Sequence, residues 1–218
     1  MTEISPAILT NDIEDFRKRY AEMLALTQHF SKLHIDFVDG IFLPNKTLMP
    51  KDLKLLRTTP VLLIAHFMTV NPQNYFIDAR DAGFKWVLFH YEAFNTDDEV
   101  RETIAFAEKL SLQPGLVLNP EMPLRRIAKF LPIIGVVQLM GINPGAQGRT
   151  FIPETLDKIR ELRSLSPSVI ICVDGGVRVG IARKCAKAGA NILVAGSAIL
   201  QSEDEAMAIE SLKLDVED

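Results

Sequence analysis

The sequence predicts an α/β protein of the (β/α)8 class, the TIM barrel, with one domain over residues 1–218. Three observations lead to this class. Eight short runs of aliphatic and β-branched residues can be counted along the chain, and amphipathic stretches separate them. Strands that alternate with helices form parallel sheets. The length of 218 residues also falls within the roughly 200–250 residues that one such barrel occupies.

We expect the eight strands at Ile4–Leu9, Leu33–Val38, Val61–Ala65, Trp86–His90, Gly115–Asn119, Val136–Met140, Val169–Val173 and Ile192–Ala195. The third run is apolar at every position, which is typical of a strand that is covered on both faces. The alternative is an open, doubly wound sheet. Because no Gly-x-Gly-x-x-Gly turn follows the first strand, the closed barrel is favoured.

About eight helices are expected between these strands. The stretch Ile13–Met23 carries apolar residues at helical spacing. Asn71 and Thr96 are each placed to cap the start of a helix, since a proline or a run of acidic residues follows them. Gly83 and Gly189 are placed to end helices in the left-handed conformation.

Composition excludes several classes of function. A net charge of −4 and a pI near 5.6 are unsuited to binding nucleic acid or a membrane surface. The first residues lack the features of a signal peptide, and the longest apolar runs are too short to span a bilayer. Cys172 and Cys185 have no metal-ligand spacing, so we expect two free, reduced thiols. A cytoplasmic protein without nucleic-acid or membrane partners is therefore predicted.

Polar residues at the carboxyl ends of three strands predict a metal site. His34 and Asp36 are two positions apart and therefore point to the same face of their strand. His66 and Asp174 end the third and seventh strands. Active sites of (β/α)8 barrels lie at this end. Imidazole and carboxylate together suit one divalent ion such as zinc, manganese, iron or cobalt.

Four other residues near the strand ends are not assigned to the metal site. Asp39 precedes a glycine and is interpreted as a turn residue. His90 either lines the pocket or caps its strand, and the sequence leaves both uses open. Met68 and Met140 are suited to core packing.

Three glycine-containing loops predict a phosphate site. They follow the sixth, seventh and eighth strands, at residues 141–150, 174–177 and 196–197. Glycine lets backbone N–H groups approach an anion closely. Barrel phosphate sites are usually built by the loops after the last two strands.

These residues carry a family resemblance. The stretches His34-Ile-Asp-Phe-Val-Asp-Gly40, His66-Phe-Met68, Asn143-Pro-Gly145, Val173-Asp-Gly-Gly176 and Ala195-Gly-Ser197 resemble ribulose-phosphate 3-epimerases, as does Leu43-Pro-Asn45. The resemblance runs from the first strand to about residue 200. Related decarboxylases and synthases carry an Asp-x-Lys-x-x-Asp run. Here the nearest approach, which starts at Asp52, ends in Arg57, so that branch is disfavoured.

The resemblance implies metal-dependent conversion of a ketose phosphate, D-ribulose 5-phosphate to D-xylulose 5-phosphate, in the pentose phosphate pathway. His34, Asp36, His66 and Asp174 would hold the metal, and Asp36 and Asp174 would act as acid and base through an enediolate. The predicted substrate-binding residues are His66, Met68, Met140, Gly145, Ala146, Gln147, Gly148, Asp174, Gly175, Gly176, Gly196 and Ser197. We also expect a homo-oligomer.

Four departures from the family pattern concern the substrate. Ala7 stands where the family usually has serine, Val38 where methionine is usual and Ile41 where histidine is frequent; the loop at residues 145–148 differs as well. None removes a predicted ligand or base. The alternatives are therefore D-allulose-6-phosphate 3-epimerase, a related sugar-phosphate epimerase, or a non-catalytic paralogue that binds phosphosugars.

Overall fold

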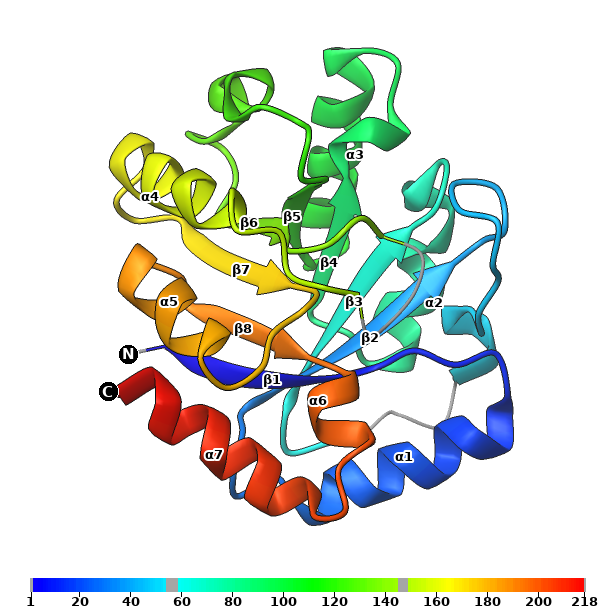
Figure 1. Ribbon diagram of the computed structural model, residues 1–218. Coiled ribbons are helices and arrows are strands. Elements are labelled where there is room, and N and C mark those ends of the chain that lie inside the picture. Colours follow the sequence, from blue (N-terminus) through cyan, green and yellow to red (C-terminus); the bar gives the residue numbers. More distant parts are fainter. Residues whose placement is uncertain (1, 54–58, 145–148, 218) are drawn as a thin grey trace. The chain divides into compact units, whose positions relative to one another are not determined.

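The computed structural model describes residues 2–53, 59–144 and 149–217. Eight strands pair in chain order, and β1 pairs with both β2 and β8, so the strand order closes into a barrel (Figure 1). The strands are β1 (Glu3–Ile8), β2 (Lys32–Val38), β3 (Leu62–Met68), β4 (Trp86–His90), β5 (Gln113–Leu118), β6 (Val136–Met140), β7 (Ile170–Asp174) and β8 (Ile192–Ala195). The predicted (β/α)8 class is confirmed.

Seven α-helices lie within the described residues: α1 (Ile13–Ala25), α2 (Phe76–Ala82), α3 (Asp97–Lys109), α4 (Thr155–Leu165), α5 (Ile181–Ala188), α6 (Ser197–Leu200) and α7 (Glu205–Glu217). The described residues between β2 and β3 form one short 3-10 helix, η1 (Pro50–Leu53), and those between β5 and β6 form two, η4 (Leu124–Arg126) and η5 (Ala128–Phe130).

No described helix is long and apolar enough to cross a membrane. The chain divides into two compact units, Ala7–Leu116 and Met1–Pro6 with Val117–Asp218.

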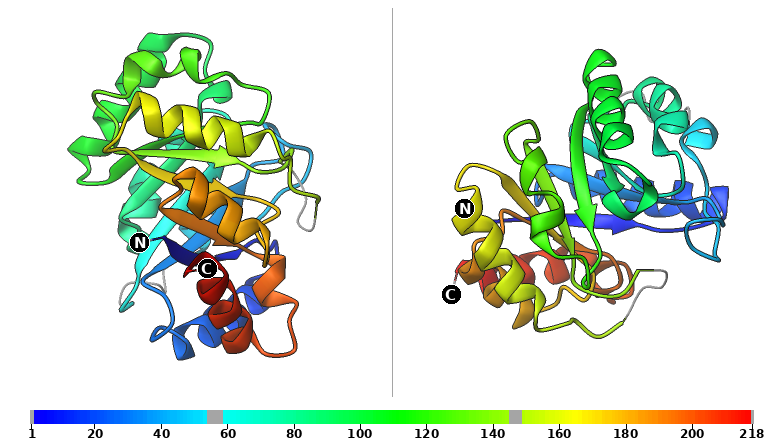
Figure 2. Two further views of the ribbon diagram at one scale, coloured as in Figure 1. Left: turned by 60° about the vertical axis from the view of Figure 1, so that its left-hand side comes forward. Right: turned by 90° about the horizontal axis from the view of Figure 1, so that it is seen from above.

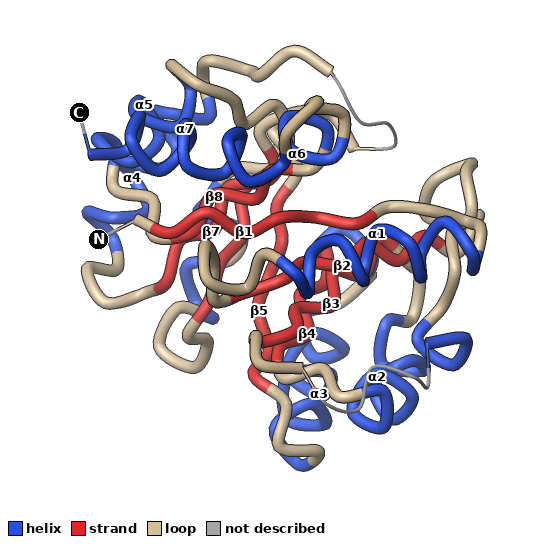
Figure 3. Tube along the Cα trace, turned by 90° about the horizontal axis from the view of Figure 1, so that it is seen from below, coloured by secondary structure: helices blue, strands red, loops and turns tan. Residues whose placement is uncertain are grey.

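In the unit Ala7–Leu116, phenylalanines on alternate strand positions form the contact between sheet and helices. Phe37 of β2 stacks against Phe67 of β3 at a ring distance of 5.3 Å. Phe76 of α2 contacts Phe67 and Phe89 at 5.8 and 5.7 Å. Figure 3 shows α2 and α3 beside the strands that they cover. Because side chains alternate along a strand, the even-numbered residues His34, Asp36 and His66 point away from this packing face.

Strand β3 extends three residues beyond the predicted end at Ala65. His66, Phe67 and Met68 stay in parallel register with Asp36, Phe37 and Val38 of β2. Continued pairing with β2 satisfies the backbone groups of these residues, so the strand does not stop where its aliphatic run stops. His66 is therefore a strand residue with a fixed backbone.

Helix ends follow the expected cap chemistry at most positions. Thr96 and Glu99 form a reciprocal capping box at the start of α3. Gly83 ends α2 in the left-handed conformation. Asn71 behaves differently from the expectation, because it precedes the 3-10 helix η2 (Pro72–Tyr75), adopts a left-handed backbone and makes no side-chain cap hydrogen bond.

In the second unit, α5 lies beside α4 and α7 (Figure 2). The buried carboxylate of Asp215, on α7, accepts hydrogen bonds from the N–H groups of Gly180 and Arg183 at 2.7 and 3.0 Å. It thereby satisfies donors at the start of α5. Gly189 ends α5 in the left-handed conformation, as predicted.

Candidate functional site

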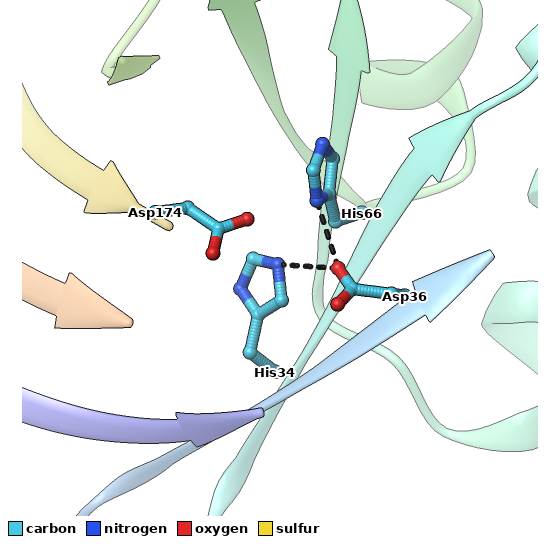
Figure 4. A group of neighbouring side chains, drawn as sticks. All are labelled: His34, Asp36, His66 and Asp174. Atoms are coloured by element: carbon cyan, nitrogen blue, oxygen red, sulfur yellow. Dashed lines mark hydrogen bonds and ion pairs between the residues drawn. The ribbon is translucent and has the colours of Figure 1, made fainter. Parts of the chain in front are cut away.

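The first part of the site is a cluster on β2 and β3. Oδ1 of Asp36 lies 2.8 Å from Nδ1 of His66 and 3.3 Å from Nε2 of His34 (Figure 4). The two imidazole rings meet edge to face at 5.2 Å. Parallel pairing produces this arrangement, since Asp36 and His66 are direct neighbours in the β2–β3 register.

The cluster is buried, and burial alone would disfavour a charged carboxylate. Desolvation acts to raise the pKa of Asp36, but the hydrogen bonds and charges of His34 and His66 outweigh it and hold that pKa well below its ordinary value. The described geometry therefore favours an ionised Asp36 between two imidazoles.

Asp174 ends β7, where it is half-buried. Its Oδ2 accepts a hydrogen bond from Nε2 of Gln138 at 3.1 Å. Gln138 is fully buried in β6, among apolar neighbours. Sequence reasoning missed this residue. The signal was an amide side chain in the middle of the otherwise apolar run Val136–Met140, because a buried polar side chain requires a partner.

One ligand atom from each of His34, Asp36, His66 and Asp174 lies within 4.8 Å of the others (Figure 4). The four residues predicted to form a metal site are thus brought together. Two imidazole nitrogens and two carboxylate oxygens form a donor set that suits a divalent transition metal. The residues present therefore fit one such ion.

His90, whose use the sequence left open, belongs to this cluster. It ends β4 and is fully buried. Its Nε2 lies 3.0 Å from Nε2 of His66, and the two rings meet edge to edge, with planes 22° apart and centroids separated by 5.2 Å. Nδ1 of His90 lies 3.7 Å from Oε2 of Glu92, a residue that sequence reasoning did not consider.

The glycines after β6 and β7 have a structural use. Gly175 and Gly176 have φ values of +101° and +71°, which residues with a side chain rarely adopt. A Cβ atom on Gly141 would lie 2.3 Å from the carbonyl oxygen of Gly175. These positions require glycine to let the two loops approach, whether or not an anion binds there.

The remaining predicted substrate-binding residues stay predictions. Gly145, Ala146, Gln147 and Gly148 lie outside the described residues. Gly196 and Ser197 are half-buried at the start of α6. Met68 and Met140 are buried at the ends of β3 and β6.

Several secondary predictions can be checked directly. Asp39 is a turn residue, since its Oδ1 accepts from the N–H groups of Ile41 and Phe42, each at 2.8 Å. Cys172 and Cys185 form no disulfide within the described residues, and both are buried. Of the departures from the family pattern, Ala7 is buried and pairs with His34 in the β1–β2 register, whereas the side chain of Ile41 is exposed.

The chain is similar to curated proteins over nearly its whole length. It is 31% identical to the ribulose-phosphate 3-epimerase of Schizosaccharomyces pombe over 97% of this chain and 92% of that protein. It is 34% identical to proteins of the same name from Synechocystis, over 96% of this chain and 92% of the relative, and from Escherichia coli, over 96% and 94%.

Solved structures support the fold. The 3-keto-L-gulonate-6-phosphate decarboxylase of Vibrio cholerae superposes with a TM-score of 0.78 over 99% of this chain and 97% of that chain, at 13% identity. The 3-hexulose-6-phosphate synthase of Salmonella typhimurium gives 0.75 over 99% and 98%, at 15% identity. At such low identity these likenesses concern the fold alone. The model of the ribulose-phosphate 3 epimerase family matches residues 3–200, and the chain therefore belongs to that family.

Proposed function

We propose that this protein catalyses the metal-dependent 3-epimerisation of a ketose phosphate, namely D-ribulose 5-phosphate to D-xylulose 5-phosphate. The observation that carries the proposal is the cluster of His34, Asp36, His66 and Asp174, whose ligand atoms lie within 4.8 Å of one another. The names of the relatives from three organisms support the choice of reaction.

The four cluster residues would hold one divalent ion, of zinc, manganese, iron or cobalt. Bound there, the ion would supply positive charge that stabilises the negative charge developing on the substrate oxygens. The nitrogens of His34 and His66 that bind the ion must carry no proton, because they bind it through their lone pairs. Asp36 and Asp174 contribute negative charge, which favours a cation at this position.

Asp36 and Asp174 would also exchange protons with the substrate. One carboxylate removes the proton from C3, and the electron pair of the broken C–H bond moves toward the C2 ketone, which gives a planar enediolate. The other aspartate, in its carboxylic acid form, gives its proton to C3 on the opposite face, which inverts the centre and leaves the first aspartate protonated. The reverse reaction uses the same two groups with exchanged roles.

Neighbouring side chains prepare the carboxylates for this work. Without the ion, the hydrogen bonds and charges of His34 and His66 favour the ionised form of Asp36, which a base requires. With the ion bound, its positive charge would favour that form instead. Nε2 of Gln138 donates to Oδ2 of Asp174 and orients that carboxylate. A fixed orientation matters because proton transfer depends on the distance and angle to the carbon.

The phosphate of the substrate would bind at the loops after β6, β7 and β8. Counted from the end of each strand to the next α-helix, at residues 141–154, 175–180 and 196, these loops contain two basic residues, Arg149 and Arg178. Backbone N–H groups would therefore hold most of the dianion. We expect kcat/KM for the dephosphorylated sugar to be far lower than for the phosphorylated sugar, and equal values would refute the phosphate site.

Solvent-deuterium incorporation tests the proposal. In D2O, D-ribulose 5-phosphate should gain deuterium at C3, and elemental analysis should find about one divalent metal per chain. Exhaustive metal removal should abolish the exchange, and full activity without metal would contradict the proposal. Preferred exchange into D-allulose 6-phosphate would identify the six-carbon alternative. Absence of exchange into any ketose phosphate, with metal bound, would favour a binding protein.

We further propose a cytoplasmic homo-oligomer, which cell fractionation and light scattering would test.

A further inference from the structure

A chain of side chains in the unit Ala7–Leu116 connects Asp36 to Glu92 through two imidazoles. Oδ1 of Asp36 lies 2.8 Å from Nδ1 of His66. Nε2 of His66 lies 3.0 Å from Nε2 of His90. Nδ1 of His90 lies 3.7 Å from Oε2 of Glu92, close enough for the carboxylate to attract a proton there.

A neutral imidazole carries one proton on one of its two nitrogens. The position of the proton on one ring of this chain therefore determines its position on the next ring. Nδ1 of His66 faces the metal cluster, and a nitrogen that ligates a metal needs its lone pair. The proton of His66 must then be on Nε2, where it donates to Nε2 of His90. His90 in turn carries its proton on Nδ1, and this N–H faces the negative charge of Glu92.

The opposite pair of tautomers would place a lone pair of His90 against the negative carboxylate of Glu92. If Nδ1–H of His66 donates to Asp36, Nε2 of His66 must accept a hydrogen bond from Nε2–H of His90. Nδ1 of His90 then carries a lone pair and faces the carboxylate of Glu92 at 3.7 Å. Electrostatic repulsion disfavours this arrangement.

Burial strengthens the effect. His66 and His90 are fully buried, and the Glu92 side chain is only 15% exposed. The ring of His90 is inclined by only 22° to that of His66 and lies 4.9 Å from the ring of Phe42. Polar interactions are stronger in such an environment than in water.

We propose that His90 and Glu92 are positioning residues that hold His66 in the tautomer able to ligate a metal through Nδ1. The inference rests on the proposed metal site and assigns work to two residues outside it. Partners that orient a ligand histidine in this way typically change metal affinity by roughly 10–100-fold when they are mutated.

Zinc affinity provides the first test. The dissociation constant of Zn²⁺ is measured by competition with a chromophoric chelator for wild type, Glu92→Gln and His90→Phe. Glutamine is similar in size to glutamate but has no charge and can either donate or accept, so it favours neither tautomer. We expect both variants to bind Zn²⁺ about 10–100-fold more weakly. Glu108→Gln, an exposed position on α3, is the matched control and should bind as wild type does.

Nitrogen-15 NMR of histidine-labelled wild type provides the second test and does not depend on any variant. With Zn²⁺ bound, His66 should carry its proton on Nε2 and His90 on Nδ1. Without metal, both histidines should keep these tautomers, because Glu92 still faces Nδ1 of His90, and a reversed pair would overturn the inference. A zinc-bound His90 protonated on Nε2 would overturn the inference, as would equal zinc affinities for Glu92→Gln and Glu108→Gln. If wild type binds no Zn²⁺, the metal site fails and the inference fails with it. Zinc binding without epimerisation would instead contradict only the proposed reaction.

Discussion

Substitution of Gly176 by alanine tests whether the loops after β6 and β7 depend on close backbone approach. Gly176 has a φ of +71°, and a Cβ atom there would lie 2.9 Å from Cα, Cβ and N of Phe151. Phe151 cannot easily retreat, because the next residue, Ile152, donates its N–H to the carbonyl oxygen of Gly141 at 2.7 Å. The alanine methyl group must therefore displace backbone atoms.

Gly180 provides a matched control. Its φ is +84°, and no described atom lies within 4 Å of the Cβ position. An L-residue in the left-handed region costs roughly 1–2 kcal/mol, and this cost applies to both alanine variants. Overpacking adds roughly 1–3 kcal/mol at Gly176 alone. The entropy that alanine removes from the unfolded chain is the same in both variants and cancels in the comparison.

We therefore expect Gly176→Ala to lower the free energy of unfolding by about 1–3 kcal/mol more than Gly180→Ala does. Urea unfolding, followed by the fluorescence of the single tryptophan, Trp86, measures both values. Because Asp174 lies two residues before Gly176, Gly176→Ala should also weaken metal binding under conditions in which it remains folded. A loss of stability for Gly180→Ala as large as that for Gly176→Ala would refute the argument from close approach.

Three further predictions concern the site and the thiols. Asp36→Asn and Asp174→Asn should each lower turnover by roughly 10²–10⁴-fold, and near-normal turnover in a metal-replete variant would exclude that residue as acid or base. Ala7→Ser should raise kcat/KM for D-ribulose 5-phosphate by about two- to twelve-fold, since one hydrogen bond contributes about 0.5–1.5 kcal/mol; no gain would indicate a pocket shaped for another sugar. Burial raises the pKa of the Cys185 thiol to about 12. Cys185 and the buried Cys172 should therefore resist alkylation at about pH 8 until the protein is unfolded, and rapid labelling of the native protein would contradict the burial.

The order of elements could be predicted because it depends on local patterns. The predicted strands overlap all eight observed ones, and Thr96 and Gly83 mark helix ends as their chemistry requires. Expectations failed where tertiary contacts decide. The loop after β5 is one case, since Nζ of Lys158 on α4 donates to the carbonyl oxygens of Asn119, Pro120 and Met122 at 2.9, 2.6 and 2.7 Å. No local pattern predicts such a contact.

The candidate site divides in the same way. Alternation along one strand determines that His34 and Asp36 share a face, and this follows from the sequence by itself. The contact between Gln138 and Asp174 joins residues 36 positions apart, and the contact between His66 and His90 joins residues 24 positions apart. Such contacts depend on the relative shift of neighbouring strands, which core packing and backbone pairing set over the whole sheet. The sequence therefore determined which chemistry is present, whereas only the tertiary structure decided that a largely buried glutamate two residues beyond β4 faces the histidine next to a proposed metal ligand.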